Sequence, residues 1–179
     1  DASNLWAVGD FGTIVHWNGT AWAPQNSGTS KHLIGVWGSD ANNLWAVGWS
    51  GTIVHWNGTA WAPQSSDTSN DFYGVWGSDA NNFWAVGKEG VIQRWNGKDW
   101  LVWKKDNTHN YFGVWGADAN HVWLVGTAGT NFAGIQMWDG TAFVNNGYVT
   151  GKRLNGVWGL AANNVYIVGE EGIILHKTR

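Results

Sequence analysis

The chain contains six histidines and 13 aspartates and glutamates, and it has no cysteine. Without cysteine, disulfides, thiolate nucleophiles and cysteine-ligated zinc are excluded. His16, His55 and His176 occupy one slot of a repeated segment, where the other two copies carry Arg94 and Met137. A metal site present in every repeat would not accept arginine or methionine at that slot. We therefore expect these histidines to be partly buried polar side chains that lie beside tryptophan.

The carboxylates also favour a structural role. An aspartate followed two residues later by asparagine recurs in three turns: Asp40 and Asn42, Asp79 and Asn81, Asp118 and Asn120. Such residues usually stabilise turns by accepting backbone hydrogen bonds, whereas a calcium loop needs about six oxygen ligands. No nucleophile-elbow motif accompanies the serines, and no two carboxylates stand out as the pair that glycoside hydrolysis needs. We expect no enzyme activity, no metal and no cofactor.

The elements that position these residues are set by an internal repeat. The segment Leu5–Gly9, with the sequence Leu-Trp-Ala-Val-Gly, has four later copies that begin at residues 44, 83, 122 and 165. The steps between copies are therefore 39, 39, 39 and 43 residues. The last step is longer because the segment 127–133 is expanded. A period near 40 residues is typical of repeat architectures such as propellers.

Each repeat contains four short blocks rich in Val, Ile, Trp and Thr and bounded by Gly, Asn, Asp or Ser, which predicts four β-strands. In order, the blocks read Gly-Val-Trp-Gly, Trp-Ala-Val-Gly, Thr-Ile-Val-His-Trp and Ala-Trp-Ala-Pro-Gln. Asn-Gly pairs such as Asn18-Gly19 separate the third block from the fourth and predict type I′ turns. No window has a sustained 3.6-residue apolar period, so no helix is expected.

Four antiparallel strands with tight turns and one longer crossover describe a blade of an all-β fold, the β-propeller. The blocks give three strands, then three complete four-stranded units, then three strands, or 18 strands in about four and a half units and five nominal blades. We expect one propeller domain over residues 1–179. Its repeat units cover approximately 1–30, 31–69, 70–108, 109–151 and 152–179.

Tryptophan accounts for 17 of the 179 residues. The strands are apolar on both sides, as expected of sheets covered on both faces, so tryptophan should fill the space between blades. The residues concerned are Trp6, Trp37, Trp45, Trp76, Trp84, Trp115, Trp123 and Trp158. The first unit lacks its first strand and the last unit lacks its fourth, and unpaired edges attract further strands. The chain is then a ring with two incomplete blades, a piece of a longer array, or a subunit that self-associates through its terminal blades.

Charge and hydropathy exclude several classes of partner. The net charge is −3 and no basic run is present, so nucleic acid is not an expected partner. No apolar stretch approaches the ~18 residues that a membrane span needs, so membrane insertion is not expected. The chain begins without an initiator methionine or a signal peptide, which is consistent with a mature product, a fragment or an engineered chain.

The run Leu33–Trp61 resembles the highly repetitive propellers of bacterial, often secreted, proteins, which are related to photosystem-assembly-factor-like and sialidase-type (BNR) repeats. The resemblance covers essentially the whole chain and implies a propeller of bacterial origin, located outside the cell or on its surface. The sialidase-type Asp-box is not matched. Turns of the form Trp-Asn-Gly-x-x-Trp, such as Trp17–Trp22, are also similar to those of small propeller lectins, some of which assemble rings from several short chains. This second similarity implies carbohydrate binding.

The repeats differ from one another mainly on one side of the predicted disc. The turns after the first and third strands are nearly constant, with the sequences Ser-Asp-Ala-Asn-Asn and Asn-Gly-Thr. The turns after the second strand and the crossovers between blades vary, and both should lie on the opposite face. Packing alone does not require one face to diverge, so this face is the candidate ligand surface; drift under weak constraint is the alternative.

We predict a lectin-like, non-enzymatic binding module that holds a glycan on this face. Aromatic and amide side chains would stack on sugar rings and form hydrogen bonds with them. The predicted binding residues are Phe11, Trp49, Tyr73, His109, Tyr111 and Phe132. Trp49 is the most informative of these, because no other repeat places tryptophan in the same turn. The alternatives are a scaffold for protein partners and, as the third choice, an enzyme with an active site on this face.

Overall fold

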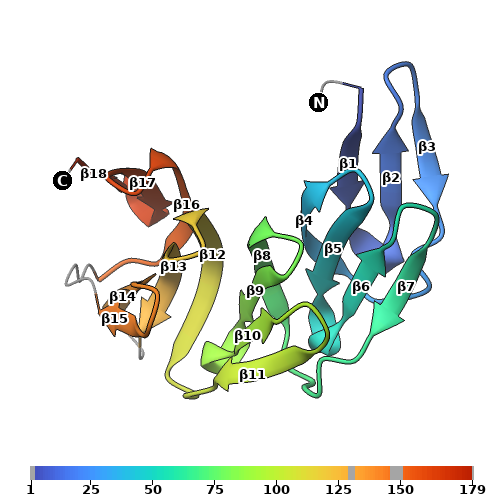
Figure 1. The fold of residues 1–179 in the computed structure, drawn as a ribbon. Coiled ribbons are helices and arrows are strands. Elements are labelled where there is room, and N and C mark those ends of the chain that lie inside the picture. The colour runs from blue at the N-terminus through green and yellow to red at the C-terminus, as the bar shows by residue number, and fades with distance from the viewer. Residues whose placement is uncertain (1–2, 129–131, 146–150, 179) are drawn as a thin grey trace.

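The computed structural model of the protein describes residues 3–128, 132–145 and 151–178. Its strands form five antiparallel sheets, the blades, which follow one another in an arc with the two termini at its ends (Figure 1). Consecutive blades contact each other through their innermost strands. Among the described residues, no comparable contact joins the first blade to the last. The arc is therefore open.

The strands fall into sheets of three, four, four, four and three. The first blade contains β1 (Leu5–Val8), β2 (Ile14–Trp17) and β3 (Trp22–Gln25). The second contains β4 (Leu33–Asp40), β5 (Asn43–Gly48), β6 (Ile53–Trp56) and β7 (Trp61–Gln64). The third contains β8 (Phe72–Asp79), β9 (Asn82–Gly87), β10 (Ile92–Trp95) and β11 (Trp100–Lys104). The fourth contains β12 (His109–Asp118), β13 (His121–Ala128), β14 (Phe132–Trp138) and β15 (Phe143–Asn145), and the fifth contains β16 (Leu154–Ala161), β17 (Asn164–Gly169) and β18 (Ile174–Lys177). The predicted propeller strand order is confirmed.

A single 3-10 turn joins the second and third strands of four repeats. These turns are η1 (Asp10–Gly12), η2 (Trp49–Gly51), η3 (Lys88–Gly90) and η4 (Glu170–Gly172), and the described residues contain no longer helix. In η2, both Ser50 (φ 57°) and Gly51 (φ 68°) are left-handed. The two left-handed residues reverse the chain within three positions and bring the turn against the crossover that follows the same blade.

The loops between the third and fourth strands differ from the predicted type I′ turns. In the loop 18–21, the backbone N–H groups of Thr20 and Ala21 both donate to Oδ1 of Asn18 at 3.0 Å. Gly19 has a positive φ of 95°, whereas Asn18 does not have the positive φ that a type I′ turn requires. The type I′ prediction was wrong because the asparagine side chain itself accepts the hydrogen bonds of the turn and supports a loop of four residues.

The core consists of clusters between consecutive blades. Trp45, Trp84 and Trp123 are fully buried there, as predicted. Trp6 of the first blade lies against Trp56 of the second, with ring centroids 5.0 Å apart. The prediction fails for Trp158, which is 58% exposed because no described blade covers the outer side of the fifth sheet.

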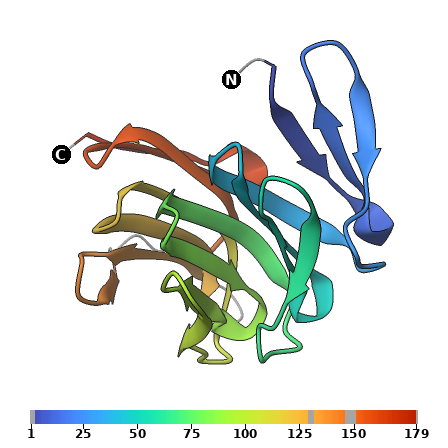
Figure 2. The ribbon, with the colours of Figure 1, turned by 45° about the vertical axis from the view of Figure 1, so that its right-hand side comes forward.

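Both ends of the arc expose faces that the inner blades bury. Leu5 in the first blade is 47% exposed, whereas Leu44, which has the same position in the second blade, is 7% exposed. At the other end, Ile174 is exposed and its counterpart Ile53 is buried. Figure 2 shows the first blade at the end of the arc, beside the second blade only. The strand sequence is the same in these cases, and the presence of a neighbouring sheet decides burial.

Candidate functional site

The 3-10 turns and the crossovers meet on one side of the arc. The backbone N–H of Trp49 donates to the carbonyl of His32 at 3.0 Å, and that of Lys88 donates to the carbonyl of Asp71 at 2.9 Å. The variable segments predicted to share a face are thus joined directly. We call this surface the variable face; it comprises η1–η4, the described parts of the crossovers and the first residues of β4, β8, β12 and β16.

Three neighbouring rings, from the first blade, the second blade and the crossover between them, form an exposed group on the variable face, with tilts of 45° and 36° between adjacent rings. The ring of His32 lies 4.9 Å from that of Phe11 and 4.3 Å from that of Trp49, measured between centroids. Phe11 is 76% exposed and Trp49 is 45% exposed. Nδ1 of His32 lies 2.7 Å from Oδ1 of Asp10, which holds the imidazole between the two rings. We call Phe11, His32 and Trp49 the aromatic stack.

Phe11 has a backbone conformation that large residues rarely adopt. Its φ is 55° and its ψ is 34°, in the left-handed region. The equivalent positions carry Ser50, Glu89 and Glu171. A left-handed conformation costs a residue with a Cβ roughly 1–2 kcal/mol, and an exposed phenylalanine recovers little of this cost by burial. Folding therefore does not explain why phenylalanine occupies this turn.

The innermost strands add a second group of side chains to the variable face. Each innermost strand pairs with the second strand of its blade, and the pairing skips one residue near the start of the innermost strand. The skipped residues are Ile34, Tyr73, Phe112 and Asn155. Such bulges redirect the extra side chain. The rings of Tyr73 and Phe112 stack with centroids 5.3 Å apart, and the guanidinium of Arg153 lies 4.9 Å from the Phe112 ring. We call Ile34, Tyr73 and Phe112 the bulge row.

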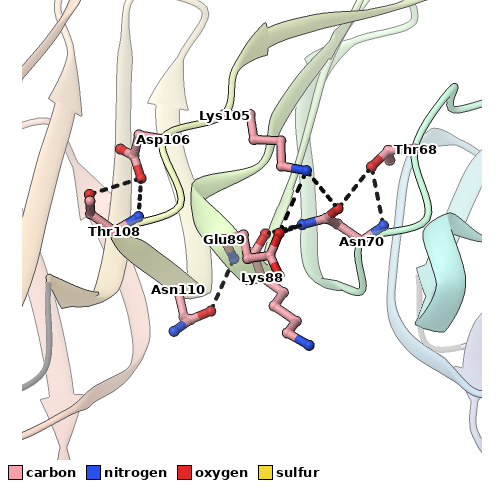
Figure 3. A network of polar contacts seen from close by, with 8 residues as sticks. All are labelled: Thr68, Asn70, Lys88, Glu89, Lys105, Asp106, Thr108 and Asn110. Atoms are coloured by element: carbon pink, nitrogen blue, oxygen red, sulfur yellow. Dashed lines mark hydrogen bonds and ion pairs between the residues drawn. The ribbon is translucent and has the colours of Figure 1, made fainter.

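A polar network fixes the part of the variable face around η3 (Figure 3). The buried amide Nδ2 of Asn70 donates to the Lys88 carbonyl at 3.1 Å and to Oε2 of Glu89 at 3.0 Å. Nζ of Lys105 lies 3.2 Å from Oδ1 of Asn70 and 3.5 Å from Oε2 of Glu89. The hydrogen bond from Asn70 and the charge of Lys105 lower the pKa of Glu89. These contacts join two crossovers to one turn and hold the surface in a single arrangement.

Asp106 anchors the crossover that follows the third blade. Burial raises the pKa of its carboxyl, but the hydrogen bond from the Thr108 N–H, the bond from Lys104 and the charge of His109 outweigh burial and lower the pKa to about 2. Nζ of Lys104 lies 3.1 Å and Nδ1 of His109 2.8 Å from Oδ2 of Asp106. A carboxyl whose pKa falls on folding stabilises the protein above its unfolded pKa, and this contribution is lost as the pH drops toward the folded value.

We therefore expect Asp106→Asn to lower the free energy of unfolding at pH 7. The difference from the parent protein should shrink from about pH 5 downward and vanish only below about pH 2, where the parent carboxyl is also mostly protonated. Urea titrations at a series of pH values measure this. A difference that stays constant over that range would show that the charge of Asp106 does not contribute to stability.

The structure distributes the six predicted binding residues unequally. Phe11 and Trp49 come together through His32, and Tyr73 joins the bulge row. His109 is half-buried and bound to Asp106. Phe132 begins β14, but its side chain lies outside the described part of the structure.

Tyr111 was wrongly included among the binding residues. It is completely buried in the cluster between the third and fourth blades, and burial strongly raises the pKa of its hydroxyl. A ligand on the variable face cannot reach this ring. Four residues of this surface were not among the predicted binding residues: His32, Ile34, Phe112 and Arg153. Ile34 and Phe112 each lie between an apolar or aromatic residue and the first glycine of the Gly-Val-Trp-Gly block. The residue type at this position varies between repeats, so comparison of the repeats could have identified both residues.

His16 and His55 have the predicted role beside tryptophan, whereas His176 is exposed and lies against Tyr166. Nε2 of His55 lies 2.6 Å from Oδ1 of Asn43, and its ring stacks on Trp45 at 4.1 Å. In the third blade, Nη2 of Arg94 donates to Asn82 at 2.8 Å. Within the described ranges, no group of three or more His, Asp or Glu side chains is placed to hold a metal ion. No helix in these ranges is long and apolar enough to cross a membrane.

The turn aspartates also behave as predicted. Oδ1 of Asp40 accepts the N–H of Asn42 at 2.8 Å, and Asp118 does the same for Asn120 at 2.8 Å. These bonds close the turns between the first and second strands, on the face opposite the variable face. The repeated aspartates are thus explained by the fold.

Comparison with known proteins supports the architecture. No family model and no curated protein matches the sequence. YCF48 from Cyanidioschyzon merolae superposes with a TM-score of 0.70 at 15% identity, over 98% of this chain and 66% of that one. A YCF48 structure bound to a D1 peptide gives 0.70 at 17%, over 100% and 61% of the two chains. The β-propeller domain of Cps50 (Swd1) from Myceliophteria thermophila gives 0.73 at 13%, over 98% and 62%.

The fold is a β-propeller. The chain spans less than two thirds of the length of each of these similar structures. At such low identity the likeness shows the fold alone.

Proposed function

We propose that this propeller is a non-enzymatic scaffold that binds a protein partner on its variable face. The observation that carries the proposal is the aromatic stack. Its rings Phe11 and Trp49 remain exposed, although the core between the blades fully buries other aromatic side chains such as Trp45. Rigid aromatic side chains that present large apolar area at low entropic cost are enriched at the centres of protein interfaces.

Two further observations support a peptide or a protein loop as the ligand. Tyr73, Phe112 and Arg153 extend the surface with residue types that interfaces favour. The strained backbone of Phe11 is the kind of local cost that persists where a side chain has a role outside folding. The similar propeller YCF48 has been solved with a D1 peptide, which is consistent with this ligand class.

The test is a selection of peptides from a displayed random library against the intact chain, followed by affinity measurements on variants. Phe11→Gly should weaken the affinity for the selected peptides at least tenfold. The same variant should leave the free energy of unfolding unchanged or raise it by up to about 1 kcal/mol, because glycine adopts the left-handed conformation without strain. Calorimetric titration and thermal unfolding measure the two effects.

Leu101→Ser is the matched control. Leu101 is half exposed on the outermost strand of the third blade, away from the variable face, so its replacement should leave peptide affinity unchanged. Equal losses at Phe11 and Leu101 would contradict a site on the variable face.

Carbohydrate is the competing ligand class, because exposed aromatic rings such as Trp49 also stack on sugars. A glycan array with the same variants separates the two. Glycan binding that Phe11→Gly or Trp49→Ala abolishes, together with failure of the peptide selection, would replace the scaffold with a lectin.

A further inference from the structure

The strand β1 has a free backbone edge. In the other four blades, the strand at the same position (β5, β9, β13 or β17) pairs on its inner side with β4, β8, β12 or β16. Within the described residues, β1 pairs only with β2. The N–H and C=O groups along the inner side of β1 are therefore available to another strand.

A groove lies between this edge and the second blade. Its volume is about 580 Å³, and it is lined by Asn4, Leu5 and Trp6 on one side and by Val36, Trp37 and Gly38 on the other. The lining is continuous with the row of innermost strands, in which β4 contacts β8, β8 contacts β12 and β12 contacts β16. The groove thus continues an interface that the protein forms three times.

Glycine environments show that the groove has room for a strand. A Cβ added at Gly48, Gly87 or Gly126 would lie 1.8–2.0 Å from a backbone carbonyl oxygen at the start of the adjacent inner strand or just before it. Gly9 holds the same position in the first blade, and a Cβ added there meets no described atom within 4 Å. The space that an inner strand fills in these other blades is open beside Gly9.

The second and third blades show how such a strand would be recognised. Nε1 of Trp37 donates to the carbonyl of Gly77 in the next blade at 2.8 Å, and its ring stacks on Trp76 at 6.4 Å. For a strand bound in the groove, the Gly38 carbonyl corresponds to the Gly77 carbonyl, and the Trp37 ring corresponds to the Trp76 ring. Trp37 is 39% exposed whereas Trp76 is 5% exposed, because no tryptophan from a preceding inner strand covers Trp37.

We propose that this groove binds an extended peptide strand with the sequence pattern apolar-x-Gly-Val-Trp-Gly, antiparallel to β1. By the register of β4 on β5, the tryptophan of the peptide lies opposite Trp6 and its first glycine lies opposite Val8. The peptide indole covers Trp37 and donates to the Gly38 carbonyl. Main-chain bonds to β1 supply affinity, and the tryptophan and glycines supply specificity, as in other cases of strand addition. None of the residues that line the groove belongs to the aromatic stack.

The test uses the intact chain and a labelled peptide with the sequence of residues 31–41, which contains Leu-Ile-Gly-Val-Trp-Gly. Fluorescence anisotropy should show saturable one-to-one binding. Hydrogen exchange should become at least tenfold slower at the Leu5–Val8 amides that point away from β2. Gly9→Val should weaken binding at least tenfold, since its side chain occupies the path of the peptide backbone. It should leave thermal unfolding unchanged, because φ at Gly9 is −170° and no described atom lies within 4 Å of a Cβ added there.

Peptide variants provide the second arm and do not depend on the folding of Gly9→Val. Replacing the peptide's tryptophan with alanine, or its first glycine with valine, should each weaken binding at least tenfold. Absence of binding up to millimolar peptide, or equal affinity for the parent and a folded Gly9→Val, would overturn the proposal. Protection, in the free chain, of the Leu5–Val8 amides that point away from β2 would do so as well, because it means that the edge is already covered. A dimer in light scattering that the peptide does not disperse would have the same meaning.

Discussion

Trp76→Ala should lower the free energy of unfolding by about 3–5 kcal/mol, as large-to-small changes of aromatic residues in cores usually do. Trp76 is buried between the third blade and its neighbours, where its ring lies against Trp37 and the backbone of Gly116. Trp158 has the same position in the fifth blade but is 58% exposed. Trp158→Ala should therefore cost less than about 1 kcal/mol.

Guanidinium titrations followed by far-ultraviolet circular dichroism compare the two variants on one scale. The pair is matched in residue type, strand position and flanking sequence, so the difference isolates the neighbouring blade. Similar losses at both positions would mean that the outer side of the fifth blade is covered in solution, and would contradict the open arc.

Gly51→Ala should cost about 2–4 kcal/mol, because two penalties coincide. Gly51 is left-handed with φ 68°, which costs alanine roughly 1 kcal/mol. The new Cβ would also lie 1.9 Å from the carbonyl oxygen of Thr68, so the crossover must move, and such overpacking costs about 1–3 kcal/mol.

Gly172→Ala is the internal control for the turn. Gly172 has φ 76°, but a Cβ there meets no described atom within 4 Å. Its replacement should cost only the backbone penalty of roughly 1 kcal/mol. Thermal unfolding of both variants measures the difference, and equal costs would show that contact with the crossover contributes nothing.

The repeat made most of the fold predictable. Four strand blocks, a constant spacing and one long crossover leave few architectures other than a propeller, and the strand order follows from chain order. The turn type was not predictable from the Asn-Gly pair, because the same pair supports either a two-residue turn or the side-chain-supported loop at Asn18. Exposure at Trp158 also could not be inferred, since burial of a blade depends on its neighbours and not on its own sequence.

Comparison between repeats located the variable face but placed single residues less well. Tyr111 aligns with Leu33, Phe72 and Leu154, which are all buried at the start of an innermost strand. The repeat pattern therefore already indicated that Tyr111 is buried. Its neighbour Phe112 reaches the surface because of the bulge, which no propensity rule indicates. The contact between the rings of Phe11 and His32 joins a turn to a crossover, and no sequence pattern relates these two positions.

The exposed ends of the arc have a consequence for cooperativity. In a linear array, each unit is stabilised by its own interactions and by the interface with each neighbour, so terminal units have one interface where central units have two. The first and fifth blades, which bury fewer of their apolar side chains, should open by local fluctuations well before the middle of the chain does. Amide exchange should then slow progressively from both termini toward the third blade. The molecule should unfold from its two ends inward and not in a single all-or-none step.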